Sequence, residues 1–396
     1  MKRIFLFLAP MLAGVMWLGG CSTTSQTTRI ATPLQPISSP FSLQLNWQLV
    51  AQKMSSADGR GLAIAEDDER IYMGAASGLL SAFWKQNKSR NVDQVAWQSL
   101  LEPRIVAGPV VVGEQLIIGT SKGDVLALSP QDGHVFWQAR LNSEVVSQPV
   151  VRLGRVFVRT NDGRVVALNA NNGEIVWVAE HQMPSLFLRG AAPVLVDDDL
   201  VYVGRESGFV EALSFATGEK VWEARVAIPS GRTDLERMVD IQAGLLLDSG
   251  RLFALSYNGR MVALNAQNGN FLWVKDISGY RDFVLFDQVL YVVDSDDVIR
   301  AIDPNTGIEY WTQADLKFRQ LGDLALDTMV MESPQLRVTD SLGYIHWLEA
   351  KDGGLTGRFK HANHLDMGRH ILQLRQDGRN YYVLDSEGTM SAYELR

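Results

Sequence analysis

The 396-residue sequence contains a single cysteine, Cys21. No disulfide can form within the chain, and a zinc site built from several cysteines is excluded as well. Basic residues are also scarce, since 37 lysines and arginines stand against 45 aspartates and glutamates and the formal net charge is -8. Nucleic-acid-binding proteins usually carry a basic surface, so that class is not indicated. No stretch has the periodicity of a long amphipathic helix, and the chain is predicted to be all-β.

A long apolar run occurs at the start of the chain, where Ile4–Leu18 follows two basic residues. The run is shorter than the roughly 20 apolar residues that span a bilayer, and it has the layout of a secretory signal. We therefore predict a signal peptide over residues 1–20. The small residues immediately before Cys21 resemble a bacterial lipobox. That resemblance implies cleavage before Cys21 and attachment of acyl chains, palmitate among them, to the new N-terminus.

The segment after the cysteine is rich in serine, threonine, glutamine and proline. Such a composition cannot bury much apolar surface, so residues 21–41 are predicted to form a lipidated flexible tether. Residues 42–396 remain for the folded domain. Ser22 follows the cysteine where an aspartate would resemble an inner-membrane retention signal, and the resemblance to lipoproteins therefore implies the outer membrane.

A repeat organises the rest of the chain. Each copy has two β-rich runs joined by a turn at Gly or Asp, then a second turn and a run that ends in tryptophan, as in Val156–Trp177. The copies that align without gaps end at Trp137, Trp177, Trp222, Trp273 and Trp311. A further short strand precedes each copy, and four antiparallel strands in 40–50 residues are typical of a propeller blade.

Counting the copies predicts an all-β, eight-bladed β-propeller with four antiparallel strands per blade. Tryptophan or its equivalent recurs at positions 47, 97, 137, 177, 222, 273, 311 and 357, with Gly357 at the last. The C-terminal copy lacks an outermost strand, and the segment around Trp47 is a strand without a blade, so their pairing would close the ring and remove an exposed edge. The tryptophans predicted to pack between blades are Trp47, Trp97, Trp137, Trp177, Trp222, Trp273 and Trp311. The alternative is that they line a ligand site.

Three motifs suggest chemistry. Gly119–Gly123 matches a G-x-S-x-G nucleophile elbow, but that elbow needs a strand followed by a helix, and here the repeat predicts a hairpin turn. His361, His364 and His370 could ligate a metal, although the repeat predicts a loop and a strand there rather than one helical face. Ala301–Trp311 resembles the repeat of pyrroloquinoline-quinone propellers, whose enzymes use a vicinal cysteine pair that this chain lacks. We therefore predict no catalytic residue, no metal and no cofactor.

Two consecutive connections between blades are longer than the others, and both are expected on one face of the ring. The first contains Leu186, Leu188 and Arg189, and the second runs over residues 231–240 with mixed charges. Apolar side chains beside charged ones are typical of a protein interface. The alternative is that the leucines belong to the local core.

Together, the signal, the lipobox, the tether and the eight blades resemble the BamB family, the lipoprotein subunits of the outer-membrane β-barrel assembly (Bam) complex. The segment 184–190 is similar to a Pro-Ser-Leu-x-Leu-Arg-Gly segment of that family. The resemblance implies a non-enzymatic scaffold that binds the periplasmic POTRA domains of BamA and assists the folding and insertion of outer-membrane proteins. It implies a lipid anchor in the outer membrane with the propeller facing the periplasm.

The resemblance also assigns contact residues. Those for BamA match Leu186, Leu188 and Arg189. A second pair of family acids matches Asp240 and Gln242, so an amide replaces one charge, and Arg237 is a further candidate. Unfolded outer-membrane proteins are a possible additional partner, through exposed blade edges. The alternatives for function are a quinoprotein-like propeller enzyme and a periplasmic glycan-binding module.

Overall fold

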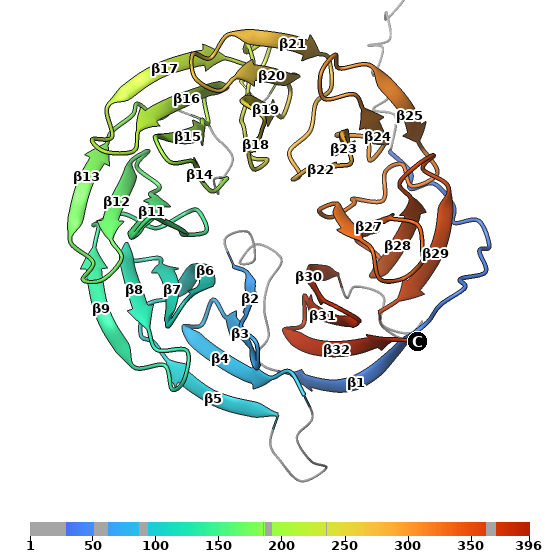
Figure 1. Cartoon of the computed structure of the whole chain (residues 1–396), viewed down its shortest axis with the longest axis horizontal. Helices are drawn as coiled ribbons and strands as arrows, with labels where there is room; N and C mark the ends of the chain where they lie inside the picture. Colours follow the sequence, from blue (N-terminus) through green and yellow to red (C-terminus); the bar gives the residue numbers. More distant parts are fainter. Residues whose placement is uncertain are drawn as a thin grey trace, which may run out of the picture. The chain divides into compact units, whose positions relative to one another are not determined.

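Eight four-stranded antiparallel sheets surround a common centre in the computed structural model (Figure 1). The structure describes residues 29–50, 62–86, 94–184, 186, 192–234, 236–361 and 370–396. Residues 31–396 form one compact unit. The regular elements among the described residues are all strands, and none of these residues lies in a helix that could cross a membrane. The predicted eight-bladed all-β propeller is confirmed.

Each blade is numbered in chain order, with its innermost strand first and blade 8 completed by β1. Blades 1 to 4 comprise β2 (Ile64–Glu66), β3 (Arg70–Gly74), β4 (Leu79–Trp84) and β5 (Val95–Leu100); β6 (Ile105–Val112), β7 (Gln115–Thr120), β8 (Asp124–Leu128) and β9 (Val135–Arg140); β10 (Val150–Arg152), β11 (Arg155–Arg159), β12 (Val165–Asn169) and β13 (Ile175–Ala179); β14 (Leu195–Val196), β15 (Leu200–Gly204), β16 (Phe209–Ser214) and β17 (Lys220–Arg225). Blades 5 to 8 comprise β18 (Leu246–Asp248), β19 (Arg251–Leu255), β20 (Met261–Asn265) and β21 (Phe271–Lys275); β22 (Val284–Phe286), β23 (Val289–Val293), β24 (Ile299–Ile302) and β25 (Glu309–Gln313); β26 (Ala325–Asp327), β27 (Gln335–Thr339), β28 (Tyr344–Glu349) and β29 (Leu355–Lys360); β30 (Ile371–Asp377), β31 (Asn380–Asp385), β32 (Thr389–Leu395) and β1 (Leu43–Val50).

The core lies between neighbouring blades. The position of a strand within its blade determines which of its side chains are buried. The middle strands β7 and β8 are buried on both faces, because each face packs against another blade, and they read as nearly continuous apolar runs. Outermost strands such as β17 alternate instead, with buried positions separated by exposed ones. This difference follows from solvent contact at the rim, which the inner strands do not have.

The ring is closed by its first strand. β1 pairs antiparallel with β32, from Leu43 opposite Leu395 to Val50 opposite Thr389, and so becomes the outermost strand of blade 8. Figure 1 shows the blue first strand alongside the red last blade. The predicted closure is confirmed, and it covers an edge of β32 that would otherwise offer unpaired backbone groups.

The indoles on the outermost strands join one blade to the next. Each of six donates its Nε1–H to a backbone carbonyl of the following blade over 2.9–3.2 Å, and the donors are Trp97, Trp137, Trp177, Trp222, Trp273 and Trp311. A glycine of the following blade lies against each ring. At Gly218, where φ is +74°, an added Cβ would stand 2.5 Å from Cε3 of Trp177. Trp47 instead stacks on Phe83 at 6.1 Å between centroids.

Residues 31–41, which the sequence predicts as part of a flexible tether, lie along blade 7. The backbone N–H of Thr32 donates to the carbonyl of Lys317 over 3.0 Å, and Arg319 donates to the carbonyl of Thr32 over 3.0 Å. Arg358 donates to the carbonyl of Gln35 over 2.8 Å. We call residues 31–41 the strap. Sequence composition misses it because the arginines and apolar side chains that hold the strap belong to parts of the ring that are distant in sequence.

The strap also supplies the aromatic ring that blade 7 lacks. Gly357 stands where the repeat expects tryptophan, and a Cβ there would lie 2.4 Å from Cζ of Phe41. The Phe41 ring meets Trp347 edge-on at 5.0 Å between centroids. A residue from the other end of the chain therefore fills the gap in the lattice.

Replacing Phe41 with alanine is expected to lower the free energy of unfolding by about 2 kcal/mol, since a half-buried aromatic ring returns to water. Chemical denaturation followed by tryptophan fluorescence measures this change. The matched variant Phe136→Ala, which removes an exposed ring of β9, should change stability by less than about 0.5 kcal/mol. Equal effects of the two substitutions would contradict the assigned role of Phe41.

Candidate docking face

The two long connections lie between neighbouring blades. The first, residues 180–194, joins β13 to β14, and the second, residues 226–245, joins β17 to β18. Both occupy the face of the ring that also carries the hairpins between the two middle strands, because each follows the fourth strand of an antiparallel blade. On this face the N–H of Ile241, in the second connection, donates to the carbonyl of Arg205 in such a hairpin over 3.3 Å. We call this side the connection face. The turns between the third and fourth strands lie on the opposite face.

The structure places some of the predicted contact residues on this surface. Leu186 is 47% exposed. The side chain of Arg237 is 51% exposed and pairs with Asp234 over 2.6 Å. Leu188 and Arg189 lie outside the described residues, as does Cys21.

Asp240 differs from an exposed contact residue, because it is only 2% exposed. Its backbone pairs with Tyr257, whose N–H donates to the Asp240 carbonyl over 2.8 Å. Gln242, at the position of the second family acid, donates from Nε2 to Oδ2 of Asp240 over 3.2 Å. Asp240 therefore fixes the end of the second connection against the neighbouring hairpin, and the amide at 242 takes part in the same arrangement.

A buried group of charges lies beneath both connections. Arg159 donates to the carbonyl of Ala192 at the end of the first connection over 3.1 Å, and it pairs with Glu206. Arg205, whose carbonyl holds the second connection, donates to Glu211 over 2.8 Å. All four charged side chains are buried. Both connections are thus attached to one rigid base that spans blades 3 and 4.

Sequence reasoning missed this base, although the repeat contains the signal. Arg159 stands at the position of Gly119 and Gly204 in neighbouring copies, and Glu211 stands where other copies have Leu126 or Val166. Charged residues at two positions that the repeat keeps small or apolar indicate that they meet a partner of opposite charge.

Glu211 makes the base sensitive to acid. Burial opposes ionisation, but contact with His181 and the charge of Arg205 together hold the pKa of Glu211 below its ordinary value. A carboxyl whose pKa is lower in the folded state stabilises the fold above its unfolded value of 4.5, and this contribution disappears as the pH falls through the folded value.

Glu211→Gln is expected to lower the free energy of unfolding at pH 7 by about 2 kcal/mol, because a charged acceptor of Arg205 is lost. The same variant should lose less stability than the wild type when the pH falls below 4.5. Denaturant titrations at pH 7 and pH 3.5 give both numbers. Parallel pH dependences for the two proteins would contradict this assignment.

The other sequence motifs belong to a hairpin turn and to buried side-chain contacts. Thr120 ends β7 and Asp124 begins β8, so the G-x-S-x-G segment is the predicted hairpin. The buried ring of His361 contacts Asp385 through Nε2 at 3.3 Å and Tyr393 through Nδ1 at 2.8 Å. His364 lies outside the described residues. Among the residues that the structure describes, no group of three or more histidine, cysteine or acidic side chains is placed to hold a metal.

The fold and the two connections define the class of this protein, which is a β-propeller with two long connections between blades on one face. A family described as "Outer membrane protein assembly factor BamB" matches residues 84–313. Proteins of that name are similar over most of the chain: 41% identical in Legionella pneumophila, with 81% of this chain and 80% of the relative aligned, and 38% identical in Pseudomonas aeruginosa, with 98% of each aligned. The Escherichia coli protein is 33% identical, with 89% and 91% aligned. The chain belongs to the BamB family of outer membrane protein assembly factors.

Solved structures agree on the fold. BamB from Moraxella catarrhalis superposes with a TM-score of 0.75 at 24% identity and covers 89% of this chain and 100% of its own. A quinohemoprotein alcohol dehydrogenase from Comamonas testosteroni superposes with a TM-score of 0.65 at 12% identity and covers 89% and 76%. At these identities the likeness concerns architecture alone.

Proposed function

We propose that this protein is a scaffold of the outer-membrane β-barrel assembly complex, and that it binds the periplasmic POTRA domains of BamA with its connection face. The observations that carry the proposal are an exposed leucine, Leu186, and an exposed arginine, Arg237, on two consecutive connections that are attached to one buried ionic base. Exposed apolar anchors on a rigid support lose little conformational entropy when a partner binds.

The candidate residues divide by role. Leu186 is the anchor that a partner would bury, with Leu188 and Arg189 following it in the same connection. Arg237 would orient the partner, since an exposed arginine can exchange its contact with Asp234 for a carboxylate across the interface. Asp240 acts as a positioning residue, because its side chain is buried.

The membrane attachment forms part of the same proposal. Acylation of Cys21 would keep the protein on the outer membrane with the ring in the periplasm, and two or more acyl chains give durable anchoring. Cys21→Ala is expected to move the protein from the outer-membrane fraction to the soluble periplasmic fraction, as measured by fractionation and immunoblotting. Retention of the variant in membranes depleted of BamA would contradict the assignment.

Contact with unfolded outer-membrane proteins is a second proposed activity, and the exposed outermost strand β13 favours it. Strand edges are usually protected by charged side chains, yet β13 has none and exposes Ile175, Val176 and Val178. An extended apolar segment could add to this edge by backbone hydrogen bonds. A photocrosslinker at Val176 should capture nascent barrel proteins more strongly than one at Glu223 on the charged rim strand β17.

Co-purification from detergent-solubilised outer membranes tests the scaffold role most simply. The tagged wild-type protein should recover BamA in a constant ratio. A purified protein that recovers glycan strands without BamA would support the glycan-binding alternative, and a quinone absorbance band would support the enzyme alternative.

A further inference from the structure

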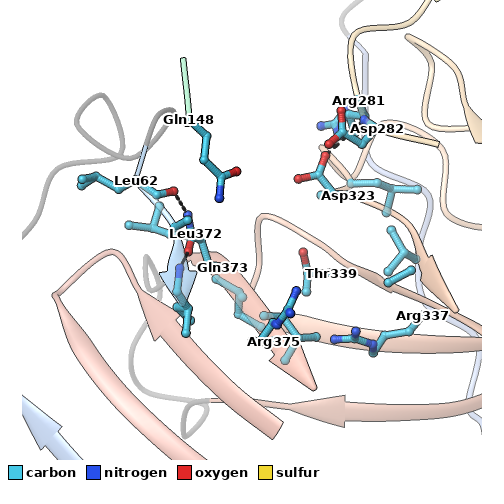
Figure 2. A pocket seen from close by; sticks show the side chains of 18 of the residues that line it. Leu62, Gln148, Arg281, Asp282, Asp323, Arg337, Thr339, Leu372, Gln373 and Arg375 are labelled. Atoms are coloured by element: carbon cyan, nitrogen blue, oxygen red, sulfur yellow. Dashed lines mark hydrogen bonds between the residues drawn. The ribbon is translucent and has the colours of Figure 1, made fainter. Parts of the chain in front are cut away.

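A cavity of about 590 Å³ lies at the centre of the ring. Residues of blade 1 and blades 3 to 8 line it, most of them at the start of innermost strands (Figure 2). Its lining includes the aliphatic residues Leu62, Leu321, Ile371 and Leu372, together with charged side chains on two walls. Ala192, Pro193 and Gln242 at the inner ends of the two connections contribute to the lining, whereas Leu186 and Arg237 do not, so the cavity is a candidate site distinct from those two exposed residues.

Arg337 on β27 is the least expected residue of this lining. It is only 6% exposed, and its Nε is fully enclosed without a hydrogen-bond partner among the described residues. A guanidinium has five donors and stays charged at neutral pH, so a buried arginine normally has an acceptor. The Tyr381 ring, 5.8 Å away, offers only its face.

The nearby carboxylate of Asp327 is already occupied. Its Oδ2 accepts from Nε1 of Trp347 over 2.9 Å and from the hydroxyl of Tyr381. Its Oδ1 accepts from Nε2 of Gln376 and from the N–H of Met329, over 2.9 and 3.0 Å. Four donors fill the four acceptor positions of a carboxylate. Asp327 therefore attracts Arg337 through space without accepting a hydrogen bond from it.

A second arginine faces the same wall. Arg375 on β30 lines the cavity beside Thr339 (Figure 2), although Glu66 holds it on its outer side over 2.9 Å. Burial, together with the positive charge of Arg375, lowers the pKa of Arg337. Two cations that meet in a concave space, one of them unpartnered, constitute a site that an anion would stabilise.

The wall across the cavity carries two acids, Asp282 and Asp323, beside Arg281, which also pairs with Asp297 over 3.7 Å, and the two acids restrict the kind of anion. Asp282 and Asp323 approach each other there, since the N–H of Asp282 donates to Oδ1 of Asp323 over 3.4 Å. Burial, together with the negative charge of Asp323, raises the pKa of Asp282 to about 6, although the hydrogen bond from the N–H of Gly244 opposes this effect. A polyphosphate would be repelled by this pair, whereas a single carboxylate bound at Arg337 would tolerate it.

We propose that the central cavity binds the terminal carboxylate of an extended peptide, with Arg337 as its primary ligand and Arg375 and Thr339 beside it. The arginine fork matches a carboxylate in shape and charge. The aliphatic lining suits apolar side chains, and the amide of Gln148, which points into the cavity in Figure 2, suits a peptide backbone. The identity of the peptide as an unfolded outer-membrane protein rests on the proposed function. The assignment of a carboxylate site at Arg337 does not depend on that function.

The test uses the tetrapeptide acetyl-Val-Thr-Val-Leu as the free acid and as the C-terminal amide, titrated into the folded wild-type protein by calorimetry. The acid should bind at least tenfold more tightly than the amide. Butyrate, a small monocarboxylate, serves as a competitor: weak competition supports a peptide chain end as the ligand, and competition as strong as that of the acid peptide overturns the peptide assignment. Equal affinity of the acid and the amide, or no binding of the acid peptide, overturns the proposal.

Variants then assign the site to Arg337. Arg337→Lys keeps a charge but removes the fork, and it should weaken the acid peptide at least fivefold while leaving the amide unchanged. Arg140→Lys, which makes the same change at an exposed arginine of the outermost strand β9, is the matched control and should change neither. A folded Arg337→Lys protein with the wild-type preference overturns the assignment. If that variant does not fold, the wild-type acid and amide titrations still decide. Co-purification of BamA with the wild-type protein tests the scaffold role separately, so a failure of the carboxylate site can be distinguished from a failure of that role.

Discussion

A chain that begins at residue 51 is expected not to yield a folded monomer, or to unfold at least about 10 °C below a chain that begins at residue 31. The longer chain corresponds to the compact unit and retains both the strap and β1. The shorter one loses the outermost strand of blade 8, the Phe41 ring over Gly357 and the Trp47 contact with blade 1. The large effect follows because each of these losses opens the same closure of the ring.

Thermal unfolding and analytical ultracentrifugation compare the two chains. The exposed edge of β32 should make the shorter chain self-associate, because unpaired strand edges recruit other strands. A synthetic peptide of residues 31–50 added in trans should restore a monomer by occupying that edge. A shorter chain that is monomeric and has the unfolding midpoint of the longer one would contradict closure by β1.

The combined substitution Leu186→Asp and Arg237→Glu is expected to weaken binding to the POTRA domains of BamA at least about a hundredfold, which corresponds to about 2.7 kcal/mol. Aspartate replaces the apolar anchor with a group that is costly to bury, and glutamate reverses the charge of the orienting residue. Biolayer interferometry with the purified POTRA segment measures the affinity.

The opposite face provides a matched control. Leu153 is an exposed leucine in the turn between β10 and β11, and its neighbour Arg152 pairs with Asp198 much as Arg237 pairs with Asp234. Leu153→Asp with Arg152→Glu therefore makes the same chemical change away from the connection face. The proposal requires wild-type affinity for this control, and unaltered affinity of the Leu186 and Arg237 double variant would reject the docking face.

The ring was predictable from the sequence because its repeat is local. Five blades place a turn at glycine or aspartate, two apolar strands and a tryptophan such as Trp222 at fixed spacing, so the same contacts recur with the same separation along the chain. The incomplete last copy and the unassigned strand at Trp47 indicated closure for the same reason. The two long connections were visible as departures from that spacing.

The remaining features depend on contacts between segments that are distant in sequence. Phe41 reaches Gly357 only after the ring has closed, and nothing in the composition around Phe41 indicates a docked segment. Asp240 belongs to a charged stretch that suggested a surface, yet pairing with Tyr257 buries it. Arg337 looks like an ordinary polar position of a strand until four other groups are seen to occupy Asp327.

A photocrosslinking amino acid at position 186, compared with one at position 153, tests the docking face most directly. Leu186 lies on the connection face and Leu153 on the opposite face, and both side chains are exposed. In cells that carry the complete assembly complex, the crosslinker at 186 should capture BamA and the one at 153 should not. Capture of BamA from 153 with none from 186 would contradict the account.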